Sequence, residues 1–442
     1  MVNESKPLVA IVGRPNVGKS TLYNRLSGTR SAIVSDTPGT TRDRITTETE
    51  WGNYNFILVD TGGITLGDDD EIWQKIREQV VQAINFADVI VFTVDAETGI
   101  APADGEVADI LRKTDTPVII AANKSDNSQR ELAATEFYSL GLGEPTPISA
   151  YHNSGIDDLM TRVLARFPSK SEHPTPEADL SLSIVGRANV GKSTLVNRIT
   201  GQDRAIVSDV PGTTRDALDT LIKYENRSVL LIDTAGIRRR GKVEQGLEHY
   251  SVLRSIRAID RARVSILLLD ATELATSQDT HIASHILDAY KAMVIVVNKW
   301  DKAPDLDITK QEAMEIVTSR FKFASYTPIC FISGILGTGI KEVMSTAYDV
   351  QHEWQKGLPR YELRRVILEA VAAHPPSPTG KRSLKIYGVT QDTKGPPSFT
   401  FYVNRTDMVH FSYQRYLENA IRKMYGFKGS RLRIRFKGRG DS

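Results

Sequence analysis

The amino-acid sequence predicts an α/β protein with two tandem nucleotide-binding domains, each a doubly wound, mostly parallel sheet, followed by a small α+β domain. Three observations carry this prediction. Residues 11–43 and 184–216 agree at 25 of 33 positions without a gap, so one unit occurs twice. Each copy alternates buried strands with amphipathic helices, which is typical of parallel sheets covered on both faces. Residues 361–442 contain no third copy.

Composition sets the broad class. A chain of 442 residues is too long for one core, and 40% hydrophobic with 25% charged residues is ordinary for a globular protein. The one cysteine, Cys330, excludes an intrachain disulfide framework and fits a reducing compartment. The N-terminus does not resemble a signal peptide, and no apolar run approaches the ~20 residues that span a bilayer. We therefore expect a cytoplasmic protein without a membrane partner.

The charge is unevenly distributed. Residues 360–442 carry 17 Lys and Arg against 6 Asp and Glu, a net charge of +11, whereas residues 1–359 have a net charge of −9. A basic end on an acidic body favours a polyanionic partner for that end.

The first copy opens with a phosphate-binding loop. Residues 8–12 are an apolar run typical of a buried strand, and GRPNVGKS (13–20) matches the pattern G-x-x-x-x-G-K-[ST]. A helical pattern follows and ends at Gly28. In this strand–loop–helix context the backbone N–H groups wrap phosphate oxygens at a helix N-terminus. Lys19 is expected to reach the β- and γ-phosphates, and the Ser20 hydroxyl to ligate Mg²⁺.

A second phosphate-facing segment follows. SDTPGTTRD (35–43) is rich in Gly, Pro and Thr and is therefore predicted to be a loop. Residues 53–60 form a predicted strand that delivers Asp60, whose carboxylate can hold Mg²⁺ through water, and the Gly63 N–H can approach the γ-phosphate. The remaining predicted elements of this copy are a helix at 71–86 and strands at 88–95, 117–126 and 146–150.

The base-recognition loop favours guanine. Asn123-Lys124-Ser125-Asp126 ends a predicted strand about 110 residues after the phosphate loop. A carboxylate at Asp126 accepts from both N1–H and the 2-amino group of guanine, and a mismatched base costs a factor of ~10⁴ or more. Asn123 and Lys124 would brace the loop. A lone N-K-x-D is most often an ordinary polar loop, but the position after a phosphate loop favours the nucleotide interpretation.

The second copy repeats the whole domain. Its phosphate loop GRANVGKS (186–193) places Lys192 and Ser193 in the same roles, and its strand end supplies Asp233. The offset is 173 at the phosphate loops and 175 at Asn298-Lys299-Trp300-Asp301. The predicted domains are residues 1–167, a Pro-rich linker at 168–180, residues 181–352, and a basic domain at 353–442.

The copies differ outside the repeated stretch. The first ends with a base-backing Ser-Ala pair at 149–150, whereas the second has Ser333-Gly334. The first carries acidic ITLGDDD (64–70) where the second carries basic IRRRGK (237–242). These two segments are either solvated loops or surfaces that dock different partners, the basic one towards RNA or an acidic domain face.

The C-terminal region has an α-β-β-α-β pattern. The predicted helices span 361–373 and 413–425, and the predicted strands span 384–390, 398–404 and 431–436. In the last strand Arg431, Arg433 and Arg435 alternate with apolar residues, which predicts one buried and one cationic face. With Tyr387, Phe399 and Tyr402 nearby, this face suits RNA backbone contacts and base stacking. The alternative is a solvated basic face. The G-x-x-G at 426–429 lies after a helix rather than between two helices, so we take it as coincidence.

Taken together, GRxNVGKS, SDxPGTTRD, DTxG and NKxD in tandem, followed by a basic α+β domain, resemble the Der (EngA) family of double-Era-like ribosome-assembly GTPases over nearly the whole chain. The resemblance implies a KH-like C-terminal domain and a bacterial-type cytoplasmic GTPase that acts on the large ribosomal subunit and its rRNA. It also implies GTP and GDP as ligands, with Mg²⁺. We expect a monomer with no DNA partner.

The resemblance to this family and to related tRNA-modification GTPases also implies metal ligands. A K⁺ ion beside the phosphates would be bound through Asn16 and Asn189. Thr41 and Thr214 would ligate Mg²⁺ together with Ser20 and Asp60, or with Ser193 and Asp233. K⁺ would partly replace an arginine finger, a stabilisation worth ~10³–10⁵ in rate when fully used. The other loop positions corresponding to the K⁺ site are Ser35, Thr37 and Thr40 in the first copy and Ser208, Val210 and Thr213 in the second.

The residues expected to contact nucleotide are the phosphate loops, the DxxG segments with the residue after them, and the base loops. In the first copy they are Gly13, Arg14, Pro15, Asn16, Val17, Gly18, Lys19, Ser20, Asp60, Thr61, Gly62, Gly63, Ile64, Asn123, Lys124, Ser125 and Asp126. In the second they are Gly186, Arg187, Ala188, Asn189, Val190, Gly191, Lys192, Ser193, Asp233, Thr234, Ala235, Gly236, Ile237, Asn298, Lys299, Trp300 and Asp301. Lys19, Lys192, Thr41, Thr214, Asn16 and Asn189 are the expected catalytic set.

One catalytic feature is absent from both copies. Many GTPases place Gln directly after DxxG to orient the attacking water, but these positions are Ile64 and Ile237. The sequence therefore predicts slow intrinsic hydrolysis, stimulated by K⁺ and by a partner. The alternatives are a guanine-nucleotide-gated RNA-binding scaffold in which one site does not hydrolyse, a membrane-remodelling GTPase, which lacks a supporting amphipathic or lipidation signal, and an ATPase, which both NKxD loops disfavour.

Overall fold

The computed structural model of the chain describes residues 6–28, 46–61, 72–168, 178–201, 208–209, 219–234, 250–376, 383–393 and 395–438. It forms two compact units, one made almost entirely of Glu4–Glu172 and the other almost entirely of His173–Ser442. The first unit is one nucleotide-binding domain, and the second combines the other nucleotide-binding domain with the C-terminal domain.

The first domain is built on a six-stranded sheet in the order β2-β3-β1-β4-β5-β6. All neighbouring pairs are parallel except β2 with β3. The central strands are apolar along their whole length because both faces of the sheet are covered. The strands are β1 (Leu8–Val12), β2 (Thr46–Trp51), β3 (Tyr54–Asp60), β4 (Val89–Asp95), β5 (Val118–Asn123) and β6 (Thr146–Pro147).

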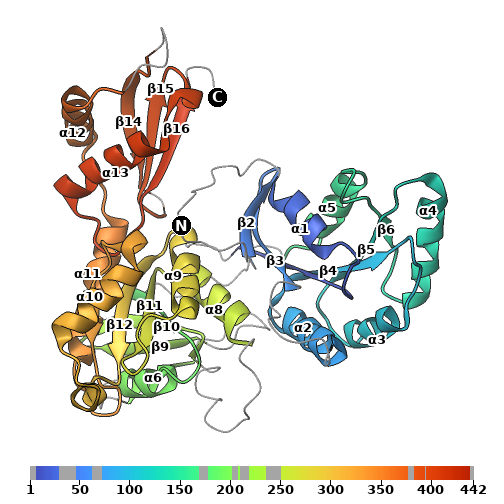
Figure 1. The fold of residues 1–442 in the computed structure, drawn as a ribbon, viewed down its shortest axis with the longest axis horizontal. Coiled ribbons are helices and arrows are strands. Elements are labelled where there is room, and N and C mark those ends of the chain that lie inside the picture. The colour runs from blue at the N-terminus through green and yellow to red at the C-terminus, as the bar shows by residue number, and fades with distance from the viewer. Residues whose placement is uncertain are drawn as a thin grey trace. The chain divides into compact units, whose positions relative to one another are not determined.

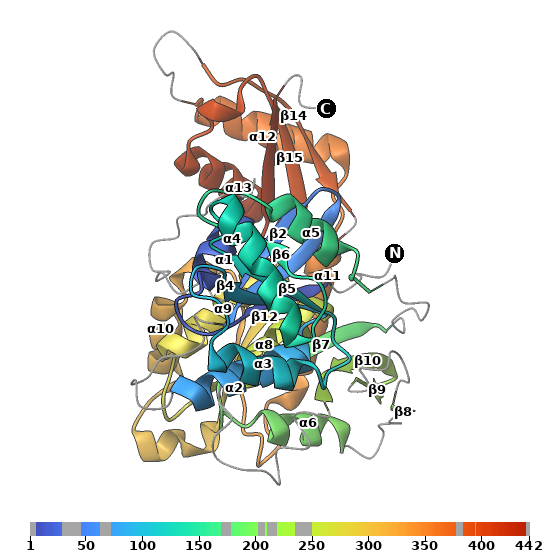
Figure 2. The same cartoon turned by 90° about the vertical axis from the view of Figure 1, so that its right-hand side faces the viewer.

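Helices cover both faces of this sheet. Apolar side chains of α1 (Lys19–Ser27) and α5 (Ile156–Leu164) pack with β1, β3 and β4 in one core. Figures 1 and 2 show these two helices on one side of the sheet and α2 (Ile72–Phe86) and α3 (Pro102–Leu111) on the other. A short helix α4 (Ser128–Ala133) and a 3-10 segment (Ala134–Leu140) follow β5. The doubly wound fold class is confirmed.

One predicted strand is shorter than expected. The prediction covered residues 146–150, but β6 contains only Thr146–Pro147. The strand stops because Ser149 pairs with Ser154 in an isolated bridge, which turns the chain back before α5.

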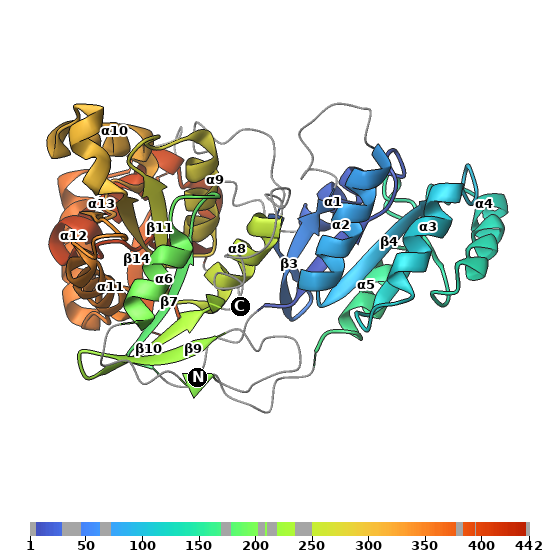
Figure 3. The same cartoon turned by 90° about the horizontal axis from the view of Figure 1, so that it is seen from below.

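The second domain repeats this plan with one more strand. Its order is β13-β12-β11-β7-β10-β9-β8, and β8 and β9 are the antiparallel edge. Figure 3 shows α9 and α11 on opposite sides of this sheet, in agreement with its two separate cores. The strands are β7 (Leu180–Val185), β8 (Ser208–Asp209), β9 (Thr220–Tyr224), β10 (Arg227–Ile232), β11 (Val264–Asp270), β12 (Ala292–Asn298) and β13 (Ile329–Phe331). The helices are α6 (Lys192–Thr200), α8 (Tyr250–Arg261), α9 (Ser277–Asp288), α10 (Lys310–Arg320) and α11 (Ile340–Gln355), with 3-10 segments at Trp300–Leu306 and Lys322–Ala324.

The C-terminal domain has the predicted α-β-β-α-β order. Its elements are α12 (Arg360–Ala373), β14 (Ile386–Asp392), β15 (Ser398–Val403), a 3-10 turn (Thr406–Met408), α13 (Phe411–Tyr425) and β16 (Arg433–Gly438). The central β15 pairs antiparallel with β14 and parallel with β16. Both helices lie on one face of this sheet and share a core with its inward side chains (Figure 1). Because α11 ends at Gln355, the boundary expected at residue 353 falls in its last turn.

The loop Gly426–Gly429 joins the C-terminal domain to the second nucleotide-binding domain. Gly429 N–H donates to the Tyr326 carbonyl (2.9 Å), and its carbonyl accepts from Met293 N–H (2.7 Å). Phe427 is fully buried, and its N–H donates to the Glu353 carboxylate (2.7 Å). This G-x-x-G loop is therefore a structural joint inside one compact unit.

Two expectations about the basic face are corrected by this joint. Arg431 donates to the Asp288 carboxylate (2.8 Å), and both Arg431 and Arg433 lie over the Tyr290 ring of the neighbouring domain. These arginines are thus engaged within the chain, and of the three predicted cations only Arg435 is exposed. Phe399 was also wrongly expected on the open face. It is fully buried because it packs edge-on against Phe427.

Two smaller findings complete the fold. Cys330 is buried, as expected of a small core residue. Within the part of the chain that the structure describes, none of the helices is long and apolar enough to cross a membrane.

Candidate nucleotide-binding sites

Each phosphate loop is shaped by two glycines that tolerate no side chain. Gly13 has φ +149°, and a Cβ there would lie 2.3 Å from the Thr93 carbonyl oxygen. Gly18 has φ +92°, and its Cβ would lie 2.3 Å from Asn123 Nδ2. Gly186 and Gly191 meet Leu268 and Asn298 in the same way. The loop is therefore pressed directly against the neighbouring strand and the base loop.

The phosphate-loop lysines point back into their own loops. Lys19 is buried, and its Nζ donates to the carbonyls of Gly13 (2.9 Å) and Arg14 (2.8 Å). Burial lowers the pKa of Lys19, which the Asp60 carboxylate only partly offsets. Lys192 makes the equivalent bonds to Gly186 and Arg187. A buried ammonium held by neutral carbonyls is poised to bind an anion.

Oxygen donors gather beside the first lysine. Ser20 Oγ donates to Asp60 Oδ2 (2.8 Å), so the last residue of β3 meets the first turn of α1. Thr61 Oγ1 donates to the Ile11 carbonyl (2.7 Å), which ties the end of β3 to β1. A hydroxyl and a carboxylate in contact are a donor set that Mg²⁺ accepts.

The second copy arranges the corresponding aspartate differently. Asp233 has a left-handed φ of +62°, and its N–H donates to Asp219 Oδ1 (3.0 Å). The other oxygen of Asp219 accepts from Arg261, and Thr220 and Thr234 share a hydroxyl–hydroxyl bond. Asp219 lies directly before β9, where the first copy has Thr46 at the same offset of 173. An ion pair between Asp219 and Arg261 thus supports the metal-side aspartate of the second domain.

An asparagine side chain connects the base loop to the phosphate loop by hydrogen bonds. Asn123 Nδ2 donates to the Val17 carbonyl (2.8 Å), and its Oδ1 accepts from Ala150 N–H (3.0 Å). Asn298 makes the same two bonds, to Val190 (2.8 Å) and from Gly334 (2.9 Å). The second copy has Gly334 where the first has Ala150, and the bond is the same in both because its donor is the backbone N–H.

The base-loop lysines are held by strand-end aspartates. Lys124 Nζ contacts Asp95 Oδ2 (2.6 Å), and Lys299 Nζ contacts Asp270 Oδ2 (2.5 Å). Burial raises the pKa of Asp270, but the hydrogen bonds from Lys299 and Thr272 outweigh it and hold that pKa below its usual value. These ion pairs hold the ammonium group of each lysine, so its aliphatic chain lies beside the base loop.

The base-reading aspartates have different surroundings. In the first copy, Asp126 accepts from Ser149 Oγ (2.6 Å) and from Arg130 (3.2 Å). In the second, Asp305 stands at the position of Arg130 with the 175-residue offset. Ser333 Oγ accepts from Leu336 N–H (3.2 Å), just as Ser149 Oγ accepts from His152 N–H (3.2 Å). Asp301 makes neither of the two contacts that orient Asp126.

The phosphate-loop arginines pair with buried helix-capping aspartates, which the sequence analysis missed. Arg14 Nε donates to the fully buried Asp104 (3.2 Å), which also accepts from Ala101 N–H (3.0 Å) at the start of α3. Arg187 approaches the corresponding Asp279 at 3.6 Å. The A-P-A-D and T-S-Q-D helix-start patterns signal both aspartates, but only as caps.

Two further braces were missed. Arg25 on α1 donates to the carbonyls of Ala150 (3.0 Å) and Tyr151 (2.7 Å) behind the base site. Arg198 on α6 does the same for Gly334 and Ile335. No local sequence signal identifies these arginines because their partners lie about 125 residues or more away.

In each domain the structure brings the phosphate loop into contact with the base loop, and in the first domain it also joins Ser20 to Asp60. Asn16 and Asn189 sit exposed in the phosphate loops with left-handed φ of +66° and +60°. Of Ser208 only the backbone is described, in β8. The predicted residues that lie outside the described ranges are Ser35, Thr37, Thr40, Thr41, Gly62, Gly63, Ile64, Val210, Thr213, Thr214, Ala235, Gly236 and Ile237, and the contrasting segments 64–70 and 237–242 lie there too.

Comparison with known proteins agrees with this geometry. The profile of the family described as 50S ribosome-binding GTPase matches residues 8–124 and 181–299. A second profile, the KH-domain-like C-terminal domain of EngA bacterial GTPase enzymes, matches residues 358–437. The GTPase Der of Chloroflexus aggregans is 48% identical over 98% of both chains. The chain belongs to the GTPase Der family.

Other relatives are equally complete. GTPase Der of Moorella thermoacetica is 47% identical over 98% of each chain, and that of Caldanaerobacter subterraneus is 46% identical over 99% of this chain and 100% of the relative. As a member of the Der family, the protein binds and hydrolyses GTP, and its C-terminal domain is KH-like. The predicted family and fold are confirmed.

Proposed function

We propose that this Der-family GTPase is a switch in assembly of the large ribosomal subunit, in which GTP hydrolysis times binding to the subunit and its rRNA. The observation that carries the proposal is the combination in one chain of two matches to the 50S ribosome-binding GTPase family with a basic KH-like domain. The net charge of +11 over residues 360–442 suits a polyanionic partner.

The donor set of the first domain fits Mg²⁺. Ser20 and Asp60 already contact each other through oxygen atoms, and both are hard ligands of the kind that Mg²⁺ prefers. Thr41 is the proposed third protein ligand, and the equivalent set in the second domain is Ser193, Asp233 and Thr214. When bound, Mg²⁺ would neutralise charge on the transferred phosphoryl group. The Lys19 and Lys192 ammonium groups would each contact the phosphates of their own site from the protein side.

We also propose that hydrolysis is slow without a partner and is stimulated by K⁺. Support comes from Ile64 and Ile237, which cannot hydrogen-bond a water. Exposed Asn16 and Asn189 at the phosphate loops present amide oxygens suited to a monovalent cation. We expect GTP hydrolysis to be faster in K⁺ than in Na⁺ buffers, with the difference reduced in Asn16→Ala and Asn189→Ala. Equal rates in both buffers would refute the K⁺ proposal.

Cosedimentation tests the ribosomal role. The full chain is sedimented with purified large subunits in GDP and in a non-hydrolysable GTP analogue. We expect binding that differs between the two nucleotides and weakens steeply with salt. Binding that is independent of nucleotide, or absent in both states, would contradict the switch.

A second candidate function follows from the different settings of Asp60, which accepts from Ser20, and Asp233, whose backbone is left-handed and bonded to Asp219. In this version one domain binds nucleotide without hydrolysing it, and the protein is a nucleotide-gated RNA-binding scaffold. Lys19→Ala and Lys192→Ala separate the candidates, because each removes one phosphate-binding ammonium. If both variants retain roughly half of the turnover, both domains hydrolyse. If one abolishes turnover and the other leaves it unchanged, the scaffold version holds.

A further inference from the structure

The sheet of the C-terminal domain has one face without helices. Register places Thr390, Thr400 and Arg435 in one row across the sheet, and Gly388, Tyr402 and Lys437 in the next. The inward rows carry Phe399, Phe401 and Ile434 into the core with α12 and α13. The outward rows therefore form the open face.

A β-bulge puts a second aromatic side chain on this open face. The register between β14 and β15 shifts between Ile386 and Gly388, so Tyr387 is the extra residue of the bulge. A bulge re-aims the side chain it inserts. Tyr387 is 48% exposed and Tyr402 is 41% exposed, although both belong to strands whose other aromatic residues are buried.

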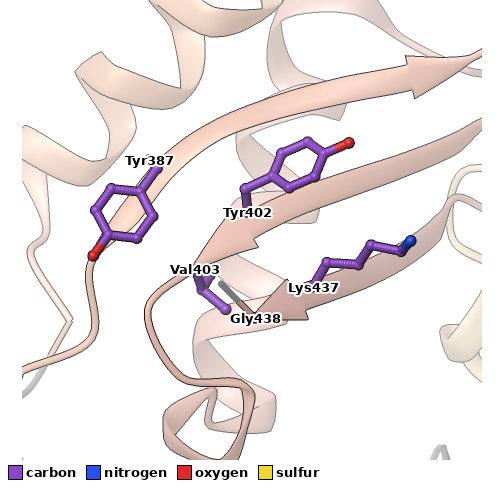
Figure 4. Close-up of a pocket in the computed structure, with 5 residues that line it drawn as sticks. All are labelled: Tyr387, Tyr402, Val403, Lys437 and Gly438. Atoms are coloured by element: carbon purple, nitrogen blue, oxygen red, sulfur yellow. The ribbon is translucent and has the colours of Figure 1, made fainter. Parts of the chain in front are cut away.

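The two tyrosines line one pocket. Figure 4 shows Tyr387 and Tyr402 on neighbouring strands, with Lys437 alongside on β16. The pocket has a volume of about 340 Å³, and Val403 and Gly438 complete its lining. Gly388 pairs with Tyr402 beside these residues, and a Cβ there would meet nothing within 4 Å, so the sheet surface next to Tyr402 is open. The size of the pocket lies within the range of ~300–1,000 Å³ for small-ligand sites.

The charge around this pocket is positive. Lys437 and Arg435 are exposed on β16, and the one acidic residue of the three strands, Asp392, lies two rows away from Tyr402, in register with Ser398 and Arg433. Flat aromatic surface flanked by cations is the chemistry that binds unpaired nucleotides, through base stacking and phosphate contacts.

The G-x-x-G at 426–429 is not available to nucleic acid. KH domains clamp the nucleic-acid backbone with a G-x-x-G loop, but this one lies between α13 and β16 rather than between two helices. In this chain Gly426–Gly429 is bonded to Met293 and Tyr326 of the second nucleotide-binding domain, and Phe427 is buried. The open sheet face is an aromatic, cationic surface that this domain leaves exposed.

We propose that the pocket between Tyr387 and Tyr402 binds an unpaired base of single-stranded RNA, with Lys437 and Arg435 on the adjoining phosphates. The proposal rests on the proposed function, because it names the part of the chain that meets rRNA. Tyr402 and Tyr387 would contact the base from neighbouring strands.

The test uses the full chain and a labelled single-stranded oligo(A) RNA, with binding followed by fluorescence anisotropy. We expect Tyr402→Ala and Tyr387→Ala each to weaken binding by about 5- to 100-fold, the range for loss of one stacked base. Tyr402→Phe should bind like the parent chain because the ring remains. Gly388→Val should also weaken binding, since it places a branched side chain in the open space beside Tyr402 without removing an aromatic ring or a charge.

Two controls separate stacking from folding and from charge. Tyr361→Ala removes a 73% exposed tyrosine on α12, on the helix side of the domain, and should leave binding unchanged. Lys437→Gln should reduce the salt dependence by about 0.7 in the slope of log K against log salt, whereas the tyrosine variants should leave that slope unchanged.

Several outcomes are decisive. If Tyr387, Tyr402 and Gly388 variants all bind RNA like the parent chain, the pocket is not the site. If they lose large-subunit binding while the parent chain binds no single-stranded RNA, the occupant is a protein and the RNA assignment is overturned. If oligo(A) binds through the pocket but large subunits do not cosediment, the site stands and the proposed function fails. If subunits cosediment equally with all variants, the function stands and the site fails.

Discussion

The two nucleotide-binding domains share a frame and differ in what supports it. In both, an asparagine joins the base loop to the phosphate loop, a lysine from the base loop meets a strand-end aspartate, and a helix arginine holds the segment behind the base. These contacts are the same to within a few tenths of an ångström. The contacts that connect the base loop to the phosphate loop are thus the same in both domains. The contacts around the two buried helix-capping aspartates, Asp104 and Asp279, differ.

The two buried helix-capping aspartates, Asp104 and Asp279, receive their hydrogen bonds from different donors. Behind the phosphate loop, Asp104 Oδ2 accepts from Ala101 N–H and Arg14, whereas Asp279 Oδ2 accepts from both the N–H and the hydroxyl of Thr276 (3.0 and 2.9 Å). A guanidinium in the first domain therefore stands in for a hydroxyl in the second. Burial raises the pKa of both carboxyl groups, so each needs donors.

The largest expected effect breaks the shared frame. Gly18→Ala forces a Cβ into Asn123 Nδ2 and puts alanine at φ +92°, a strain of about 1–3 kcal/mol before the clash is counted. We expect nucleotide affinity of the first domain to fall by ~100-fold or more, so that the chain binds one GDP instead of two by isothermal titration. Gly191→Ala should have the same effect on the second domain.

A matched control exists in the same domain. Gly105 lies inside α3, and a Cβ there meets nothing within 4 Å. Gly105→Ala should keep both GDP sites and stabilise α3 by up to about 1 kcal/mol. If Gly18→Ala also retains two sites of parental affinity, the asparagine junction does not control nucleotide binding.

A smaller effect should distinguish the domains. Arg14→Ala leaves buried Asp104 with only Ala101 N–H as a donor, whereas Arg187→Ala leaves Asp279 with both Thr276 donors. We expect Arg14→Ala to destabilise its domain by about 1–3 kcal/mol and Arg187→Ala by less. Because the three domains need not unfold together, amide hydrogen exchange of α3 and α9 is the suitable measurement.

The pH dependence of this loss has a definite sign. Burial already raises the pKa of Asp104, and removing Arg14 raises it further. A carboxyl whose pKa is higher in the folded than in the unfolded state loses stability as pH rises through the folded value. The protection of α3 in Arg14→Ala should therefore approach the parental value in acid and fall towards neutral pH. A difference that stays constant with pH would show that Arg14 acts by packing rather than by charge.

The same contrast explains what the sequence predicts and what it does not. Both phosphate loops, both base loops and the α-β-β-α-β domain follow from local patterns and are placed as expected. The antiparallel strands β2 and β9 were missed, although the two-residue turns Gly52-Asn53 and Glu225-Asn226, with positive φ at three of the four residues, are a usable hairpin signal.

Other features had no local signal. Arg431, which precedes β16, and Arg433, its first residue, keep the predicted alternation. Their partner Tyr290 lies about 140 residues earlier, so nothing local shows that they face the neighbouring domain. Long-range pairing, rather than propensity, determined where these arginines lie. By contrast, Phe399 shares a strand face with Phe401 and Val403, so the alternation along β15 could have assigned it to the core.

The smallest expected effect concerns the guanine-reading aspartates. Arg130 and Ser149 orient Asp126, and the second domain has Asp305 in place of the arginine. A half-exposed ion pair contributes about 0.2–1 kcal/mol, so Arg130→Ala should weaken GDP binding to the first domain by no more than ~5-fold. Asp305→Arg should tighten the second domain by a similar factor, because it supplies Asp301 with the cation that Asp126 has.

The paired variants are measured by titration of fluorescent GDP, each in a background where the other domain carries its lysine-to-alanine substitution. ATP serves as the competitor that reports base selectivity. Opposite shifts in the two domains mean that the orienting cation sets the affinity difference between them. If Arg130→Ala changes nothing while Ser149→Ala weakens GDP binding, the hydroxyl alone orients Asp126, and the difference between the domains resides in Ser149 and Ser333.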